Sequence, residues 1–191
     1  MRKKDLTRND LESARAEVFH MILFALAWVM IGEYVLDFRD YAAGAAVVLA
    51  ASVGLGLRSI EIDKMEDELP NGGAGRRKPF QLYVLIFLFE AAAIMATWMI
   101  LLHVGHEDWL VPAFALVAGL HFIPLARVIQ LNSYYLLGAW ICILAAVGYL
   151  LPAGGKVTVV TGNTLVAYGC AAGAIADGIW IVASIRRNGG V

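Results

Sequence analysis

The composition of this 191-residue chain excludes an ordinary soluble protein. Hydrophobic residues make up 60% of the sequence and charged residues 16%, with a formal net charge of −1, whereas soluble domains carry about 25% charged residues. The stretches 41–57 and 128–155 contain no charged residue. The chain also lacks a basic patch with interleaved aromatic residues, the pattern typical of nucleic-acid binding. The composition therefore predicts an integral membrane protein that binds no nucleic acid.

The N-terminal part of the chain predicts a polar tail followed by two membrane spans. Residues 1–17 contain five basic residues and precede an apolar segment at 18–36. That segment is longer than the apolar region of a signal peptide and no small-residue cleavage site follows it, so we predict an uncleaved first span. Within the tail, 9–17 are expected to form a short amphipathic helix. The second span, 41–57, is rich in small residues, which predicts a central position in the bundle.

Residues 58–79 form a polar loop, and four further apolar stretches follow it. The acidic part of this loop lacks the spacing of a calcium-binding loop, so a solvated segment with a flexible link is the favoured interpretation. We predict the later spans at 80–102, 109–127, 133–151 and 157–185. The expected fold is an all-α membrane protein, a bundle of six transmembrane helices made of three antiparallel hairpins over residues 18–187.

The distribution of basic residues predicts the orientation of this bundle. Thirteen of the 15 Lys and Arg residues fall on one side of the predicted arrangement, and only Arg39 and Lys156 fall on the other. By the positive-inside rule both termini, and the tail 1–17, are cytoplasmic. A bacterial inner (plasma) membrane is the expected location, and a eukaryotic membrane is also compatible with the rule. Glu33, near the outer end of the first span, is expected to pair with Arg39 at the interface.

Three ionisable residues are predicted to lie deep within the spans. Counted from the cytoplasmic ends of their helices, Glu90, His121 and Asp177 lie at depths of about 15, 9 and 12 Å, so they can meet in one plane. A carboxylate at such a depth costs roughly 3 kcal/mol unless a partner or water satisfies it. We therefore expect the bundle to be organised around the span 80–102 and its central Glu90. Proton exchange or cation binding is the chemistry that such a site suits.

Polar residues recur at seven-residue spacing on two of the spans, which places each set along one helix face. The third span carries Tyr83, Glu90 and Thr97, and the sixth carries Asn163, Cys170, Asp177 and Ser184. Packing is the favoured role of Cys170 and Ser184. Pro124 is expected to kink the fourth span beside His121. The candidates for binding an ion or substrate are Glu90, His121, Asp177, Tyr83, Thr97 and Asn163. The alternative for these residues is that they only hydrogen-bond one helix to another.

The predicted outer loop contains two histidines, His103 and His106, which are candidate metal ligands together with the adjacent acidic residues. The spacing of a metalloprotease motif is absent, so an ordinary interfacial turn is the favoured interpretation. No cofactor is expected, and no catalytic residue is assigned.

Three hypotheses for function remain open. The first is a small transporter or channel coupled to protons or cations through buried acidic residues. The second is a non-catalytic membrane component that acts through partner proteins. The third is an intramembrane enzyme that acts on a lipid or quinone through the same acidic residues and histidine. It is disfavoured because the dense polar cluster that such enzymes usually carry at the membrane interface is missing from the sequence. The expected partners are the lipid bilayer, a small solute or cation, and a second copy of the chain.

Overall fold

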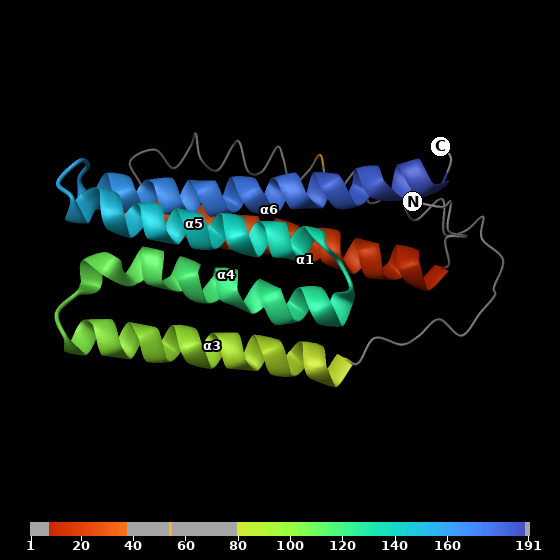
Figure 1. Ribbon diagram of the computed structural model, residues 1–191, viewed down its shortest axis with the longest axis horizontal. Helices are drawn as coiled ribbons and strands as arrows, with labels where there is room; N and C mark the ends of the chain where they lie inside the picture. Colours follow the sequence, from red (N-terminus) through yellow and green to blue (C-terminus); the bar gives the residue numbers. More distant parts are fainter. Residues whose placement is uncertain (1–7, 38–53, 55–79, 190–191) are drawn as a thin grey trace.

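The structure is a computed structural model that describes residues 8–37, Gly54 and 80–189. No strand occurs in these residues, which confirms the all-α class. Five long helices and one 3-10 turn are arranged side by side (Figure 1). They are α1 (Arg8–Val35), α3 (Phe80–His103), η1 (Glu107–Trp109), α4 (Leu110–Ile129), α5 (Ser133–Ala153) and α6 (Val159–Gly189).

All five long helices are long and apolar enough to cross a membrane. This finding is compatible with an integral membrane protein. Helix α1 covers the expected first span up to Val35 and includes the whole predicted amphipathic segment 9–17, while α3 to α6 cover nearly all of the last four stretches predicted to span. The predicted second span at 41–57, with its small residues, and the polar loop 58–79 fall outside the described residues, apart from Gly54.

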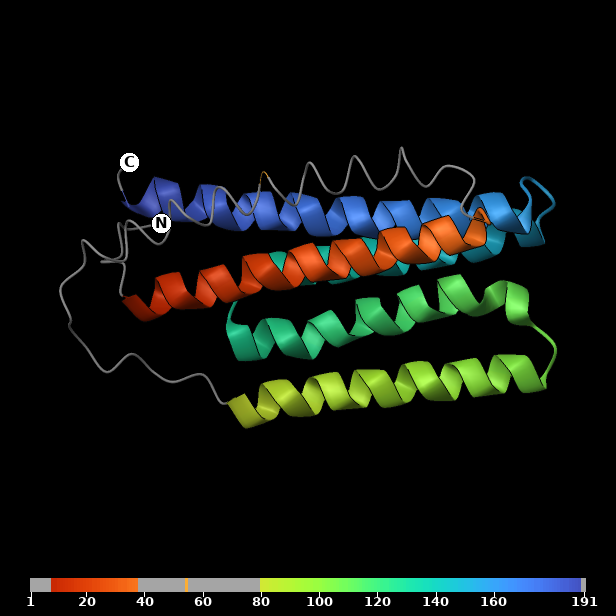
Figure 2. The same cartoon turned by 180° about the vertical axis from the view of Figure 1, so that it is seen from behind.

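Short turns reverse the chain between the later helices. Helix α4 ends at Ile129, and the next residue, Gln130, has a left-handed backbone conformation (φ 61°, ψ 34°), a common way for a helix to terminate. Before α6, the hydroxyl of Thr158 accepts a hydrogen bond from the backbone N–H of Thr161 at 3.1 Å, which caps the helix start. As a result, α4 and α6 run antiparallel to α3 and α5 (Figures 1 and 2).

Glycines allow close packing of α4 against α5. A Cβ atom added at Gly138 would lie 2.8 Å from the carbonyl oxygen of Gly119 and 3.1 Å from Cβ of Phe122. Such distances leave no room for a larger residue at this crossing, and small residues bring helix backbones together in membranes. Beside the crossing, Phe122 is fully buried. The core of the described bundle is formed by α1, α4, α5 and α6, in which α1 packs on α6, α6 on α5, and α5 on α4.

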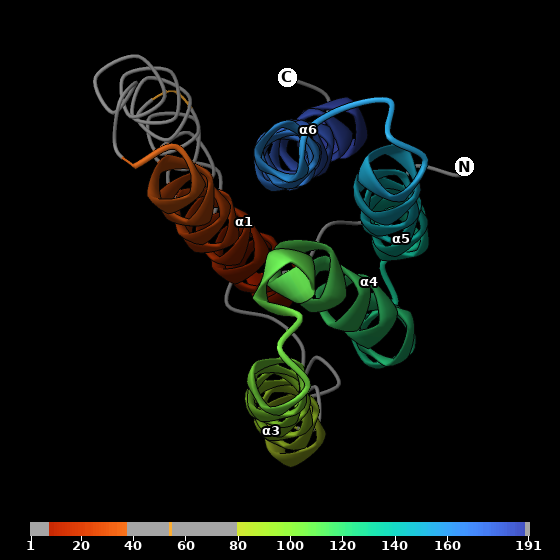
Figure 3. The ribbon, with the colours of Figure 1, turned by 90° about the vertical axis from the view of Figure 1, so that its left-hand side faces the viewer.

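Helix α3 lies at the edge of this bundle, next to α4 (Figure 3). In the most apolar stretches of α4 and of α6, half of the residues are buried. In the corresponding stretch of α3, no residue is buried. The prediction that the bundle is organised around 80–102 is therefore wrong for the described part of the chain. The physical reason is that α3 is apolar on all sides, which suits a helix surrounded by lipid as well as a central one.

Candidate functional site

The structure brings together Glu90 of α3 and His121 of α4. The Oε1 atom of Glu90 lies 3.0 Å from Nδ1 of His121, and the two side chains are 12% and 5% exposed. This separation is that of an ion pair, but the atoms are not aligned as a hydrogen bond. Nε2 of His121 is also buried and has no hydrogen-bond partner among the described residues. The pair joins the edge helix α3 to the core of the bundle.

Aromatic side chains and a second histidine surround this pair. The ring of Phe87 lies 5.7 Å from that of His121 and 5.1 Å from that of His20 on α1, measured between centroids. Phe122 contacts both imidazoles, with centroid distances of 4.3 Å to His121 and 6.5 Å to His20. Three helices thus contribute to one cluster, which contains two imidazoles and one carboxylate. Nothing in the sequence pattern singles out His20, because it lies only two residues inside the predicted first span.

A buried carboxylate that was assigned to the polar tail extends the cluster. Glu17 on α1 is buried and accepts a hydrogen bond from the hydroxyl of Tyr134 on α5. The Tyr134 ring in turn packs on Phe122, with 5.2 Å between their centroids. The sequence placed Glu17 at the end of the tail because it precedes the apolar run. In the structure α1 is continuous through this point, so Glu17 faces the bundle.

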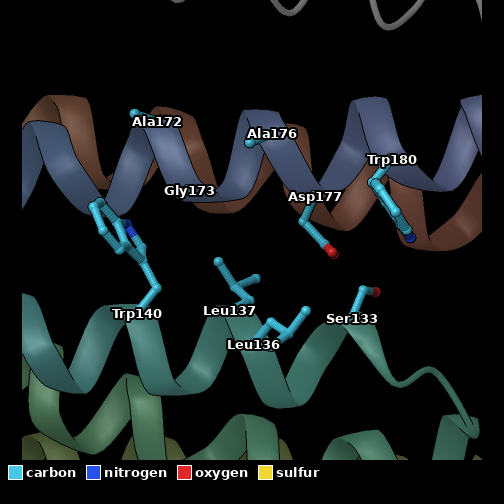
Figure 4. Close-up of a pocket in the computed structure, with 9 residues that line it drawn as sticks. All are labelled: Ser133, Leu136, Leu137, Trp140, Ala172, Gly173, Ala176, Asp177 and Trp180. Carbon is cyan, nitrogen blue, oxygen red and sulfur yellow. The ribbon is translucent and has the colours of Figure 1, made fainter.

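Asp177, the third predicted member of the site, lies in a different environment. It lines a pocket of about 440 Å³ between α5 and α6. Ser133, Leu136, Trp140, Gly173 and Trp180 are among the other lining residues (Figure 4). Neither Glu90 nor His121 lines this pocket. The geometry thus pairs Glu90 with His121 and places Asp177 opposite α5.

The remaining polar candidates have mixed surroundings. On α6, Asn163, Cys170 and Asp177 are all buried. These three residues, which are spaced seven apart, therefore lie on a buried face of the helix. The Asn163 side-chain amide donates a hydrogen bond to the backbone oxygen of Asp108 at 3.1 Å, which ties the start of α6 to η1. Thr97 on α3 is half-buried. Tyr83 belongs to α3, but its side chain is outside the described part of the chain.

The outer-loop histidines are on the surface. His103 and His106 are both exposed, and within residues 8–37 and 80–189 no group of three or more His, Cys, Asp or Glu side chains is arranged to hold a metal ion. Glu33 differs from its expected interfacial position, because it is fully buried and accepts a hydrogen bond from the hydroxyl of Tyr168 on α6. Arg39, its expected partner, lies outside the described residues.

Comparisons with known protein families, curated proteins and solved structures find no match to this chain. The case for a function therefore depends on the geometry of these residues.

Proposed function

We propose that this protein is a small transporter or channel that moves protons, or a cation coupled to protons, through the Glu90–His121 pair. The observation that carries the proposal is the 3.0 Å contact between a carboxylate and an imidazole inside helices of membrane-spanning length. Acidic and imidazole groups within spanning helices commonly form proton relays and ion pathways. The contact also brings together two of the residues that the sequence pattern singles out.

The energetics of a buried pair favour this role. With one shared proton the pair carries no net charge, whether the proton resides on the imidazole or on the carboxylate. Gain or loss of a proton leaves a net charge, which costs several kcal/mol in a low-dielectric environment. The pair stays neutral, and the cost is avoided, if a cation leaves the site when a proton binds or enters it when a proton is released. The Nε2 atom of His121, which has no hydrogen-bond partner in the described part of the chain, supplies a further position at which a proton can arrive or depart.

The proposed membrane arrangement is the six-span bundle of three antiparallel hairpins in a bacterial inner membrane, with both termini in the cytoplasm. One structural feature supports an additional crossing between α1 and α3. Helix α1 ends at one end of the bundle and α3 begins at the opposite end (Figures 1 and 2). The basic residues Arg127 and Arg187 belong to the cytoplasmic ends of α4 and α6 in this arrangement, as the positive-inside rule requires.

Proton flux in liposomes tests the proposal. The purified protein is reconstituted with a trapped pH-sensitive dye, and a pH gradient or a cation gradient is imposed. We expect wild-type protein to dissipate the gradient and Glu90→Gln to fall to the level of protein-free liposomes, because glutamine keeps the shape of the side chain and cannot release a proton. Glu107→Gln is the matched control, since Glu107 is exposed in η1.

Thermal stability in detergent separates a transport role from a structural one. A transport role requires that Glu90→Gln remains folded while flux is lost. If the wild type carries no flux under any imposed ion gradient, and Glu90→Gln unfolds at a lower temperature, the transporter proposal is wrong. A membrane component that acts through partner proteins is then the better hypothesis.

A further inference from the structure

The pocket between α5 and α6 contains an acidic group that has no counter-ion among the described residues. Asp177 is 7% exposed, and its Oδ2 atom has no hydrogen-bond partner among the described residues. In the same part of the chain, no cationic side chain lies within ion-pair distance of it. Figure 4 shows the carboxylate directed from α6 toward Ser133 of α5. The buried Ser133 hydroxyl does not meet the geometry of a hydrogen bond either. The negative charge of Asp177 is thus not neutralised by a cationic side chain of the described residues.

Tryptophans stand at both ends of this pocket (Figure 4). The indole of Trp140 lies against α6 where Gly173 leaves space for it, since a Cβ atom at Gly173 would be 2.7 Å from Cδ1 of the indole. Its N–H donates to the backbone oxygen of Gly169 at 3.0 Å, which fixes the ring. The ring of Trp180 already accepts one cation, because the Arg187 guanidinium carbon lies 5.3 Å from its centroid. Indole faces attract cations more strongly than other aromatic rings do.

From these features we propose that the α5–α6 pocket binds a lipophilic organic cation, an amine or quaternary ammonium that carries apolar groups. Asp177 supplies the negative charge, Trp140 and Trp180 supply aromatic faces, and leucines supply apolar walls. Ca²⁺ and Mg²⁺ take about six or more oxygen ligands, whereas the lining side chains of this pocket offer only those of Asp177 and Ser133. A neutral apolar ligand would leave the carboxylate unpaired. In a zwitterionic lipid, repulsion of the phosphate offsets the attraction of the ammonium group.

Binding of this ligand depends on the pocket alone, whereas its assignment as the transported substrate rests on the proposed function. The Glu90–His121 pair contributes no residue to the pocket. A protein that binds the cation at Asp177 and exchanges protons at Glu90 would have separate sites for substrate and coupling ion.

Equilibrium dialysis of the purified full chain in maltoside detergent tests the inference, with tetraphenylphosphonium as the probe. Tetraphenylborate, measured in separate samples, has nearly the same shape and the opposite charge. We expect saturable binding of tetraphenylphosphonium only, and a loss of at least about tenfold in affinity for Asp177→Asn. Asp108→Asn is the matched control, because the Asp108 side chain is exposed and lies outside the pocket.

A second variant keeps the test decisive if Asp177→Asn does not fold. Ala176→Leu fills the pocket from an exposed position and is expected to abolish binding, whereas Ala139→Leu, also exposed but outside the pocket, should leave it unchanged. Equal affinities of wild type and Asp177→Asn for tetraphenylphosphonium, or equal binding of tetraphenylborate, would overturn the inference. Dialysis requires no ion gradient, so it measures binding independently of transport. If the protein binds tetraphenylphosphonium but carries no proton flux, only the proposed function is wrong. If Glu90-dependent flux occurs without binding of the probe, only this inference is wrong.

Discussion

At the scale of single residues, tyrosines hold the buried carboxylates of α1. Glu17 accepts a hydrogen bond from Tyr134 of α5, and Glu33 accepts one from Tyr168 of α6. Both carboxylates are buried, and the second oxygen of Glu33 has no partner among the described residues. A phenol is a suitable partner because it satisfies a carboxylate without adding a second buried charge. These bonds fasten the first helix to the last two.

The bond between Tyr168 and Glu33 gives the residue-scale prediction. Hydrogen bonds between helices in membranes contribute about 0.6 kcal/mol on average, but removing the partner of a buried carboxylate costs more. We expect Tyr168→Phe to reduce the free energy of unfolding by about 1–2 kcal/mol, measured by thermal or denaturant unfolding in detergent. Tyr34→Phe is the control, since Tyr34 is 73% exposed. Equal stability of the two variants would show that Glu33 does not depend on Tyr168.

At the scale of helices, the crossing of α4 and α5 depends on two glycines. Gly119 and Gly138 face one another so closely that the added Cβ atom at either position would lie within 3.0 Å of the other's carbonyl oxygen. The crossing sets the position of His121, two residues beyond Gly119, and of Phe122, which packs on His121, His20 and Tyr134. Packing at this crossing therefore positions the aromatic cluster around the Glu90–His121 pair.

Overpacking this crossing should destabilise the protein. Gly138→Leu would place a large side chain against the α4 backbone and is expected to cost about 1–3 kcal/mol, the usual range for overpacked sites. Ala139→Leu introduces the same side chain one residue later, at an exposed position of α5, and should be near neutral. Thermal unfolding in detergent compares the two. If Gly138→Leu is as stable as Ala139→Leu, the close approach of α4 and α5 is wrong.

At the scale of the whole molecule, the alternating directions of α3 to α6 yield a topology that can be measured. The turn between α5 and α6 lies at the opposite end of the bundle from the last turn of α6 (Figure 1). If the helices cross the membrane in the proposed orientation, a reporter fused after Arg187 should be cytoplasmic and one inserted within 152–156 should be external. Paired fusions to a reporter active only outside and one active only inside the cell measure this. A cytoplasmic signal from 152–156 would contradict the six-span arrangement.

Much of the fold follows from the sequence because membrane-length helices are defined by local properties. A long apolar run satisfies its own backbone hydrogen bonds as a helix, so the all-α class and the stretches at 80–102, 109–127, 133–151 and 157–185 can be predicted without knowledge of any contact. The presence of ionisable groups within these runs is equally visible. Glu90, His121 and Asp177 could therefore be singled out from the sequence alone.

Only the tertiary structure decided which of these groups meet and which helices form the core. Lipid provides no hydrophobic drive that turns one helix face toward another, so hydropathy does not reveal the partner of an apolar helix. Glycine crossings, tyrosine–carboxylate bonds and aromatic packing determine the arrangement instead. They pair Glu90 with His121, turn Asp177 toward α5, and leave α3 at the edge of the described bundle. The sequence alone does not reveal these contacts, because each one joins side chains that are far apart in the chain.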